Sequence, residues 1–192
     1  MAKIIKGDLL HNTYWNEKEK ECWNDKIYIV HQTNCVSFNA GGLAQDLIER
    51  YGQRADVYSE REPLWVNYNI AKESSRSQPG SIKISRGSPN IVSFFAQYMY
   101  GTTENEIYDD YDIQLKEGIK ADTEKNRLIY FDQCLTHLER ELNSGEKVLF
   151  PFKIGCNLAG GKWIEYKEKI DNFANTVKNK NITVYIINLY LK

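Results

Sequence analysis

The 192-residue sequence predicts an α/β protein, a three-layer α/β/α sandwich in which a mixed, mostly parallel central sheet lies between helices. Several segments are almost continuous apolar runs, which is typical of strands buried on both faces. These runs alternate with stretches whose apolar residues recur at helical spacing. Two of the strand-to-helix connections are rich in glycine. In sheets of this class the ligand binds at the carboxyl ends of the strands, where such connections lie.

Composition narrows the class of protein further. A net charge of −1 gives no sign of a general nucleic-acid or membrane surface. No apolar run approaches the roughly 20 residues of a membrane span, and the N-terminus lacks the pattern of a signal peptide. The four cysteines are widely spaced without a Cys-x-x-Cys pair, which favours free thiols over a zinc site. We therefore expect one cytoplasmic domain over residues 1–192, monomeric and without a metal or cofactor.

The first half of the chain contains the clearest strand signals. Residues 3–6 (KIIK) predict a first strand that ends at Gly7-Asp8, and residues 11–25 predict a polar loop. Residues 27–33 (IYIVHQT) are dense in β-branched and aromatic residues and predict a buried strand. The helix that follows, 43–51, is indicated by an apolar stripe made of Leu43, Leu47 and Ile48.

The middle of the chain is less regular. Residues 53–79 predict a continued helix and then a surface connection. Residues 81–85 and 91–97 predict two hairpin strands. Residues 98–127 are polar and include the acidic run 108–112 (YDDYD), which we interpret as a solvated connection rather than a cation site.

The last third alternates helix and strand. A long helix that ends near Ser144-Gly145 is indicated by the spacing of Leu128, Phe131, Leu135, Leu138 and Leu142. Residues 148–152 predict a short buried strand, and residues 182–189 predict the final one. Between them, a second amphipathic helix is indicated by the apolar face of Trp163, Tyr166, Ile170, Phe173, Ala174 and Val177.

The two glycine-rich connections share one design. Residues 34–42 (NCVSFNAGG) and residues 151–163 (PFKIGCNLAGGKW) each lead from a strand end to a helix start. Glycine lets backbone N–H groups approach a ligand, and the positive end of a helix dipole favours an anion. Two ordinary turns with packing glycines are the alternative. The paired design favours two phosphate sites, or one diphosphate held from both sides.

Four motifs resemble those of macrodomains, the α/β/α modules that bind ADP-ribose. They are Gly7-Asp8-Leu9 after the first strand, Asn34 in HQTNC, Gly41-Gly42-Leu43-Ala44 at a helix start, and IGCNLAGG at residues 154–161. The order and spacing of the motifs carry the resemblance over nearly the whole chain. It implies a single macrodomain whose connections near 56–79 and 98–127 are enlarged.

The resemblance also implies ligand roles. Asp8 is expected to accept a hydrogen bond from the adenine amino group, with Leu9 beside it, and Asn34 to bind the distal ribose. A turn-capping role is the alternative for both polar residues. The diphosphate is expected to contact the two glycine motifs, that is Gly41, Gly42 and Leu43 on one side and Gly155, Cys156, Asn157, Leu158 and Ala159 on the other. Near the chain end, Asn188 and Tyr190 stand where the family often contacts adenine.

One residue of these motifs departs from the family. Asn157 occupies a position where members commonly have glycine. Asparagine is the residue other than glycine that best tolerates a positive φ, so we expect the turn to survive. We expect the replacement of glycine by Asn157 to affect activity more than the fold.

His31 is the main catalytic candidate. In the macrodomain branch that removes phosphate from ADP-ribose 1″-phosphate, a histidine in a similar H-x-x-N-C context is the proposed catalytic residue. The resemblance therefore implies metal-independent hydrolysis of ADP-ribose 1″-phosphate, with His31 and Asn34 at the reacting end. A buried, hydrogen-bonded and inert histidine is the alternative.

Other functions stay open. In the branch that frees ADP-ribose from glutamate, a lysine and an aspartate act where this chain has Gln97 and Ala159, and neither replacement can do that chemistry. Hydrolysis of ADP-ribosylated protein or nucleic acid by substrate positioning alone is still an alternative. A nucleophilic pair of His31 and Cys35 is another. The last is a non-catalytic module that binds or senses ADP-ribose or a related nucleotide.

Overall fold

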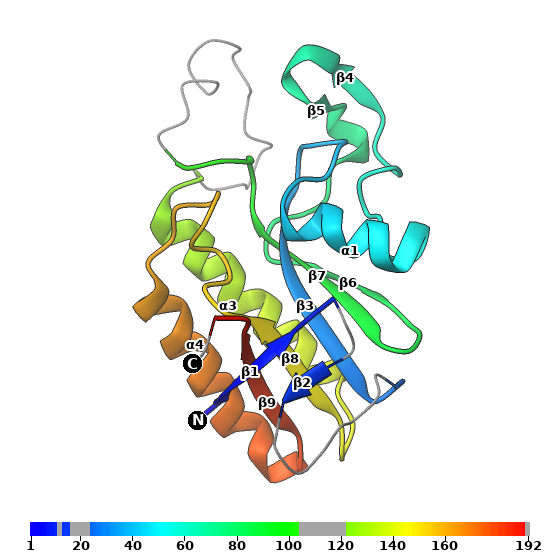
Figure 1. The fold of residues 1–192 in the computed structure, drawn as a ribbon. Helices are drawn as coiled ribbons and strands as arrows, with labels where there is room; N and C mark the ends of the chain where they lie inside the picture. The colour runs from blue at the N-terminus through cyan, green and yellow to red at the C-terminus, as the bar shows by residue number, and fades with distance from the viewer. Residues whose placement is uncertain (11–12, 16–23, 104–121, 191–192) are drawn as a thin grey trace.

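The computed structural model describes residues 1–10, 13–15, 24–103 and 122–190. The acidic run 108–112 and much of the expected connection 98–127 lie outside the described residues. The described chain is an α/β/α sandwich with a central sheet between helices (Figure 1). In the described part of the chain, no helix combines the length and the apolar character needed to cross a membrane.

The central sheet has seven strands in the order β2-β1-β9-β8-β3-β7-β6. The five inner strands are parallel to one another. The outer strands β2 and β6 each pair antiparallel with the inner strand beside them. The strands are β1 (Lys3–Asp8), β2 (Thr13–Trp15), β3 (Ile27–Asn34), β6 (Ile82–Ser85), β7 (Asn90–Gln97), β8 (Lys147–Pro151) and β9 (Thr183–Asn188). The predicted mixed, mostly parallel sheet is therefore confirmed.

Helices cover both faces of this sheet. The helices α3 (Glu124–Glu141) and α4 (Trp163–Val177) lie on one face, and α1 (Leu43–Tyr51) lies on the other (Figure 1). Strand β3 serves both layers because successive side chains of a strand point to opposite faces. Tyr28 and Val30 belong to the core under α3 and α4, whereas Ile27 and Ile29 belong to the core under α1.

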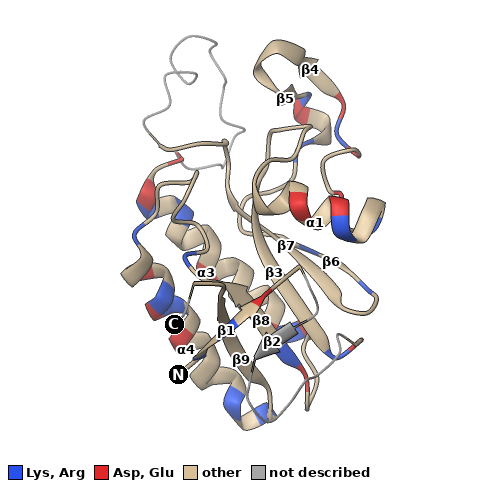
Figure 2. Ribbon diagram, in the orientation of Figure 1, with Lys and Arg blue, Asp and Glu red and all other residues tan. Residues whose placement is uncertain are grey.

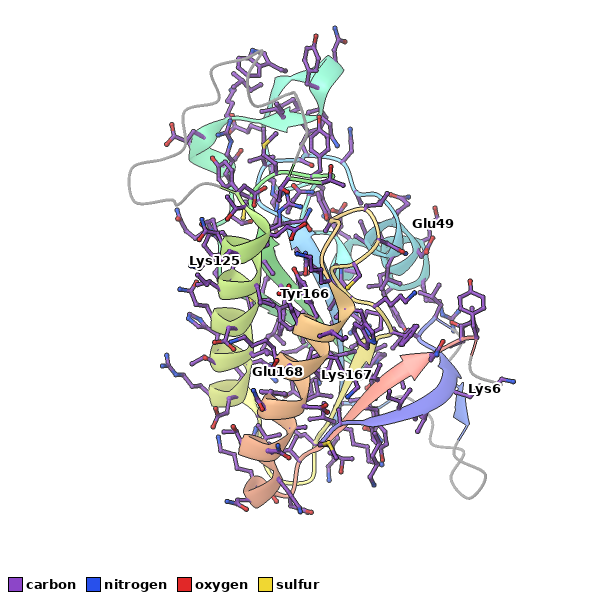
Figure 3. The ribbon with its side chains drawn as sticks, turned by 90° about the vertical axis from the view of Figure 1, so that its left-hand side faces the viewer. Lys6, Glu49, Lys125, Tyr166, Lys167 and Glu168 are labelled. Atoms are coloured by element: carbon purple, nitrogen blue, oxygen red, sulfur yellow. The ribbon has the colours of Figure 1, made fainter. Side chains whose placement is uncertain are left out.

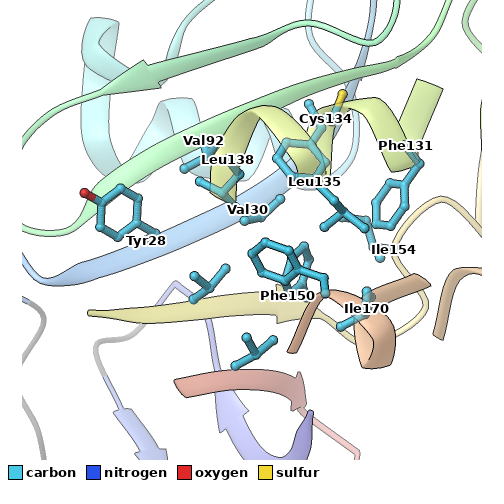
Figure 4. Close-up of a cluster of buried hydrophobic side chains, with 14 of the residues drawn as sticks. Tyr28, Val30, Val92, Phe131, Cys134, Leu135, Leu138, Phe150, Ile154 and Ile170 are labelled. Atoms are coloured by element: carbon cyan, nitrogen blue, oxygen red, sulfur yellow. The ribbon is translucent and has the colours of Figure 1, made fainter. Parts of the chain in front are cut away.

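The larger core lies beneath α3 and α4. Figure 4 shows Val30 of β3 and Phe150 of β8 opposite Phe131 and Leu135 of α3. The rings of Phe131 and Phe150 are 6.4 Å apart between centroids. Each fully buried side chain of this size contributes about 1.5–3 kcal/mol. This core fixes the positions of the strand ends from which the glycine-rich connections start.

Residues 56–79 form more than the predicted surface connection. They contain a two-stranded sheet of β4 (Pro63–Trp65) and β5 (Ile70–Ala71), together with the 3₁₀ turns η2 (Val66–Tyr68) and η3 (Glu73–Ser75). The predicted continuation of α1 is the 3₁₀ turn η1 (Gly52–Ala55), and a second such turn, η4 (Lys178–Lys180), follows α4. A separate hydrophobic cluster joins this segment to the end of β3, and it includes Tyr58, Ile70, Cys35 and Val36.

Charges of both signs are spread over the helical layers, as Figure 2 shows for α1, α3 and α4. Two ion pairs join α4 to α3, between Lys162 and Glu124 (3.0 Å) and between Lys169 and Asp132 (3.2 Å). Exposed pairs of this kind add little to stability. Among the described residues no group of three His, Cys, Asp or Glu side chains is placed to hold a metal ion.

Candidate functional site

The carboxyl ends of the parallel strands meet at one edge of the sheet. Two loops rise from this edge, and we call residues 34–42 the first glycine loop and residues 152–162 the second glycine loop. The first leads from β3 to α1 and the second from β8 to α4. Strands β3 and β8 are neighbours in the sheet, so the two loops start side by side.

The tips of the two loops meet. A methyl group at Gly42 would lie 3.5 Å from Cδ1 of Leu158. Leu158 is 70% exposed, so it projects from the second loop instead of filling the core. The structure thus brings the predicted diphosphate residues Gly41, Gly42 and Leu43 close to the predicted residues around Leu158.

The N–H groups of the first loop fall into two sets. Those of Val36 and Ser37 donate to Oδ1 of Asn34 (3.1 and 2.7 Å), and those of Phe38 and Asn39 donate to Oδ1 of Asn69 (3.2 and 2.8 Å). Helix α1 begins after Gly42 without a side-chain cap. Within the described residues, the N–H groups of residues 40–43 donate to no protein acceptor. They are the part of this loop that can bind an anion.

Most carbonyl groups of the first loop face the connection 56–79. Five of them, at residues 34, 35, 36, 37 and 39, accept hydrogen bonds from the connection 56–79. The donors are Arg61 (to residues 34 and 37), the N–H groups of Ser77 and Ala71 (to 35 and 36), and the amide of Asn69 (to 39). The connection therefore holds the loop from behind through its main chain.

The second loop is shaped by close approach to Tyr166 on the first turn of α4 (Figure 3). A methyl group at Gly155 would lie 2.5 Å from the Tyr166 ring, and one at Gly161 would lie 2.5 Å from the same ring. Gly155 also has a φ of +73°, which glycine adopts without strain. These glycines are required by packing, which was the alternative the sequence left open for them.

The second loop also has unpaired N–H groups. Cys156 donates its N–H to the carbonyl of Lys153 (3.0 Å), and Gly160 donates to that of Asn157 (3.0 Å). In the described structure the N–H groups of residues 157–159 have no protein acceptor. Of the predicted diphosphate residues, Cys156 is thus the one whose N–H is already used.

Asn157 does not have the backbone conformation that the sequence led us to expect. In this loop the residues with positive φ are Lys153 (+59°), Gly155 and Gly160 (+73° each). Asn157 is exposed and keeps an ordinary φ, so its tolerance of positive φ is not what preserves the turn. The expected explanation was wrong because the tight bend falls on Lys153 and Gly155.

A buried ion pair anchors the second loop. Arg127 of α3 donates to the carbonyls of Ala159 (3.0 Å) and Gly101 (2.6 Å), and it pairs with Asp122 (2.5 Å). The side chains of Arg127 and Asp122 are 1% and 0% exposed. Asp122 also accepts the N–H groups of Tyr98 and Met99 (3.0 and 2.9 Å). The pair therefore ties the end of β7 to the second loop.

Asp8 and Leu9 lie three strands away from β3, at the end of β1. Oδ1 of Asp8 accepts the N–H of Leu10 (2.8 Å), which is the turn-capping role. The Leu9 side chain is buried in the core under α1, so only its main chain is placed to meet a ligand. At the end of β9, Asn188 likewise caps a turn by accepting the N–H of Tyr190 (3.0 Å).

Asn34 lies at an irregularity of β3, where the register with β7 shifts between Thr33 and Asn34. Such a bulge re-aims the side chain at a strand end. Its Oδ1 atom caps the first loop, while its Nδ2 group has no acceptor among the described residues. The capping and the predicted ribose-binding roles therefore use different atoms of one amide.

His31 is buried, with 1% of its surface exposed. Its Nε2 shares a hydrogen bond with Oγ of Ser93 (2.9 Å), and its Nδ1 has no partner in the described residues. Burial lowers the pKa of His31 to about 4, so the ring is neutral at physiological pH. These observations favour the inert alternative, and catalysis by His31 stays a prediction.

The three cysteines in the described residues, Cys35, Cys134 and Cys156, are protonated thiols. Burial raises the pKa of Cys35 far above its usual range, and it raises that of Cys156 to about 11. A thiol in that state is a poor nucleophile. The structure therefore speaks against a reactive pair of His31 and Cys35. Gln97 is engaged as well, since it accepts from Gln32 (2.7 Å) and donates to the carbonyl of Met99 (2.9 Å).

A recess of about 470 Å³ lies elsewhere, lined by Ile82, Ile84, Arg86, His137, Arg140 and Glu141. The recess lies at the amino ends of the parallel strands, opposite the glycine loops, because β6 and α3 both run antiparallel to the inner strands and line the recess. Its size does not make it the functional site. The glycine loops are the better candidate, because their unpaired N–H groups can donate to an anionic ligand.

Several residues of the site carried no recognisable pattern in the sequence. Arg61, Asn69, Asp122 and Arg127 are isolated polar residues in irregular or polar stretches. Their roles depend on contacts between distant segments, such as that of Arg127 with Ala159. The sequence does not show which polar side chains are buried, and it therefore gave no signal for these four residues.

Comparisons with known proteins add little. No model of a known protein family matches the chain, and no curated protein matches it. Among solved structures, the chain is similar to a protein of unknown function from Bacteroides thetaiotaomicron, with 18% identity over 97% of this chain and 98% of that one. The TM-score is 0.49, so this likeness carries no argument about function.

Proposed function

We propose that this chain binds ADP-ribose or an ADP-ribose derivative, with the diphosphate held between the two glycine loops. The close approach of the Leu158 side chain to Gly42 is the observation that carries the proposal, because it places the two loops, each with unpaired N–H groups, side by side. One set belongs to residues 40–43 and the other to residues 157–159. The uncapped N-terminus of α1 adds the positive end of its dipole.

The ends of the ligand follow from the strand order. Asp8 ends β1 and Asn34 ends β3, and β9 and β8 lie between those strands. Three strand spacings separate them by about 14 Å, which suits a ligand with two nucleoside-sized ends joined by a diphosphate. In this proposal Asp8 accepts the adenine amino group, and Nδ2 of Asn34 donates to a hydroxyl of the distal ribose.

Hydrolysis of ADP-ribose 1″-phosphate is the second candidate. The observation in its favour is the unpaired Nδ1 of His31, because the neutral tautomer with its proton on Nε2 leaves a free lone pair on Nδ1 that can serve as a general base. The observation against it is the burial of that ring, which the reaction would have to overcome. Removal of ADP-ribose from protein or nucleic acid is a weaker candidate, and no titratable side chain at Gln97 or Ala159 supports it.

Calorimetric titration with ADP-ribose tests the proposal. We expect one site per chain and weaker binding of AMP and ribose 5-phosphate, each of which fills only half of the site. Absence of binding at millimolar ADP-ribose would refute the proposal. Phosphate release from ADP-ribose 1″-phosphate by the wild type and by His31→Ala then separates the two candidates. Release that is lost in His31→Ala, with ADP-ribose binding retained, would establish the second.

A further inference from the structure

Arg61 lies directly behind the first glycine loop and is 4% exposed. Its Nη2 donates to the carbonyl of Asn34 (2.8 Å) and to Oγ of Ser77 (3.1 Å), and its Nη1 donates to the carbonyl of Ser37. One planar guanidinium thus holds both the start and the middle of the loop. A fork of this shape is a property of arginine that lysine lacks.

The positive charge of Arg61 forms no salt bridge with a described residue, although Asp56 and Glu60 are near enough to raise its pKa. Among the described residues, no carboxylate lies within ion-pair distance of its guanidinium. Its neighbours are the rings of Tyr58 and Phe95, at 4.9 and 5.7 Å from ring centroid to Cζ, and its Nε is unpaired. Burial lowers the pKa of Arg61, yet a guanidinium stays protonated at physiological pH. A buried charge without a close counter-charge is unfavourable, and an anion bound nearby would offset part of that cost.

The loop geometry indicates where compensation comes from. The carbonyls of the first loop face Arg61 and the connection, while the N–H groups of residues 40–43 have no protein acceptor. An anion bound by those N–H groups would be attracted by both the loop dipoles and the charge behind them. Because Arg61 is buried, its potential is screened less by salt than that of a surface charge.

We infer that Arg61 is a positioning residue that makes this site selective for anionic ligands, so that a diphosphate binds more tightly than an uncharged nucleoside. This inference rests on the proposed function and deepens it. The guanidinium does not touch the ligand. It fixes the loop through two carbonyls, and the bound diphosphate adds negative charge on the side of the loop where no described carboxylate pairs with Arg61.

Three variants separate charge from bracing. Arg61→Lys keeps the charge and gives up the fork, Arg61→Gln keeps a neutral donor and gives up the charge, and Arg76→Gln is the matched control. Arg76 belongs to the same connection and donates to the carbonyl of Ala71 (2.9 Å) and to Tyr98 (3.0 Å), so neither of these hydrogen bonds goes to a carbonyl of the glycine loops. Calorimetry with ADP-ribose, and competition with adenosine, is run on each, with thermal unfolding as the check on folding.

We expect Arg61→Gln to bind ADP-ribose roughly tenfold more weakly and adenosine unchanged, Arg61→Lys to stay within about threefold, and Arg76→Gln to match the wild type. A Gln variant with wild-type affinity, or Lys and Gln variants with equal losses, would overturn the inference. If Arg61→Gln does not fold, Arg61→Lys is the deciding variant. A loss of ADP-ribose affinity beyond tenfold in Arg61→Lys would show that the hydrogen bonds to the loop matter and the charge does not, which overturns the inference. Failure of the wild type to bind ADP-ribose would instead refute the proposed function.

Discussion

The two glycine loops are built alike but anchored differently. Each follows a parallel strand, precedes a helix and is held by a buried arginine that donates to main-chain carbonyls, Arg61 for the first loop and Arg127 for the second. Arg127 is neutralised by Asp122 at 2.5 Å. Arg61 faces aromatic rings and has no carboxylate within ion-pair distance among the described residues.

This difference separates a purely structural anchor from one that also affects binding. A neutralised pair fixes geometry and leaves little field outside itself, whereas an unpaired buried charge projects its potential through the protein. The second loop can therefore contribute N–H groups and shape, and the first loop adds a net positive potential. The variants below test this division, beginning with the largest expected effect.

Arg127→Met should lower the free energy of unfolding by about 3–5 kcal/mol, because it leaves the Asp122 carboxylate buried without its partner. Arg61→Met should cost less, since no opposite charge is left behind. Urea denaturation of both variants measures the contrast. A double variant, Arg127→Met with Asp122→Leu, should recover part of the loss. If Arg127→Met is no less stable than Arg61→Met, the two anchors do not differ as described.

Acidification should lower the free energy of unfolding through His31, which lies on β3 below the first loop. Burial lowers the pKa of His31 from 6.5 to about 4, so the unfolded chain binds a proton more readily than the folded chain between those values. Stability contributed by the neutral ring is present above pH 6.5 and is lost as the pH falls toward 4, by up to about 3 kcal/mol. Strand β8, below the second loop, holds no histidine.

Denaturant unfolding at pH 7 and pH 4.5 measures this dependence, with His31→Gln as the variant that cannot titrate. The wild type should lose more stability than His31→Gln over the same interval. Parallel losses in the two proteins would mean that the ring is already accessible to protons, and would revive His31 as a catalytic base.

Glycine substitutions give the smallest and sharpest contrast. Gly155→Ala should cost about 1–3 kcal/mol, because φ is +73° and the new methyl group would lie 2.5 Å from the Tyr166 ring. Gly41→Ala meets no atom within 4 Å, so it should change stability by less than about 0.5 kcal/mol. Thermal unfolding and ADP-ribose titration are compared for both. Gly41→Ala should weaken binding at unchanged stability, and wild-type affinity there would place the ligand elsewhere.

The layers of this fold were predictable because periodicity in the sequence reports burial directly. The apolar run 27–33 and the stripe of Leu128, Phe131 and Leu135 became β3 and α3 as expected. The glycine loops were found from composition and order alone. The contact of Gly42 with Leu158 follows from β3 and β8 being neighbours, which a list of elements does not reveal.

The remaining parts of the site depend on long-range contacts. Residues 56–79 lack a regular period, so nothing in the sequence indicated that Asn69 and Arg61 hold the first loop. The role of Asn157 was misjudged because the sequence does not show which residue of a loop adopts a positive φ. In this loop Lys153 and Gly155 adopt it at the tight bend, and Asn157 does not. His31 lies near the end of its strand in sequence yet under α1 in space, so its position suggested access that burial denies.

The link between the connection and the first loop runs through backbone carbonyls at residues 34–37 and 39, together with the buried side chains of Cys35 and Val36. An exposed residue of this loop such as Asn39 can therefore be exchanged with little penalty, while a deletion in the connection would remove the donors that hold these carbonyls. An engineer who wished to shorten this chain would do better to cut elsewhere, and one who wished to alter ligand choice could randomise residues 38–40 and keep the scaffold.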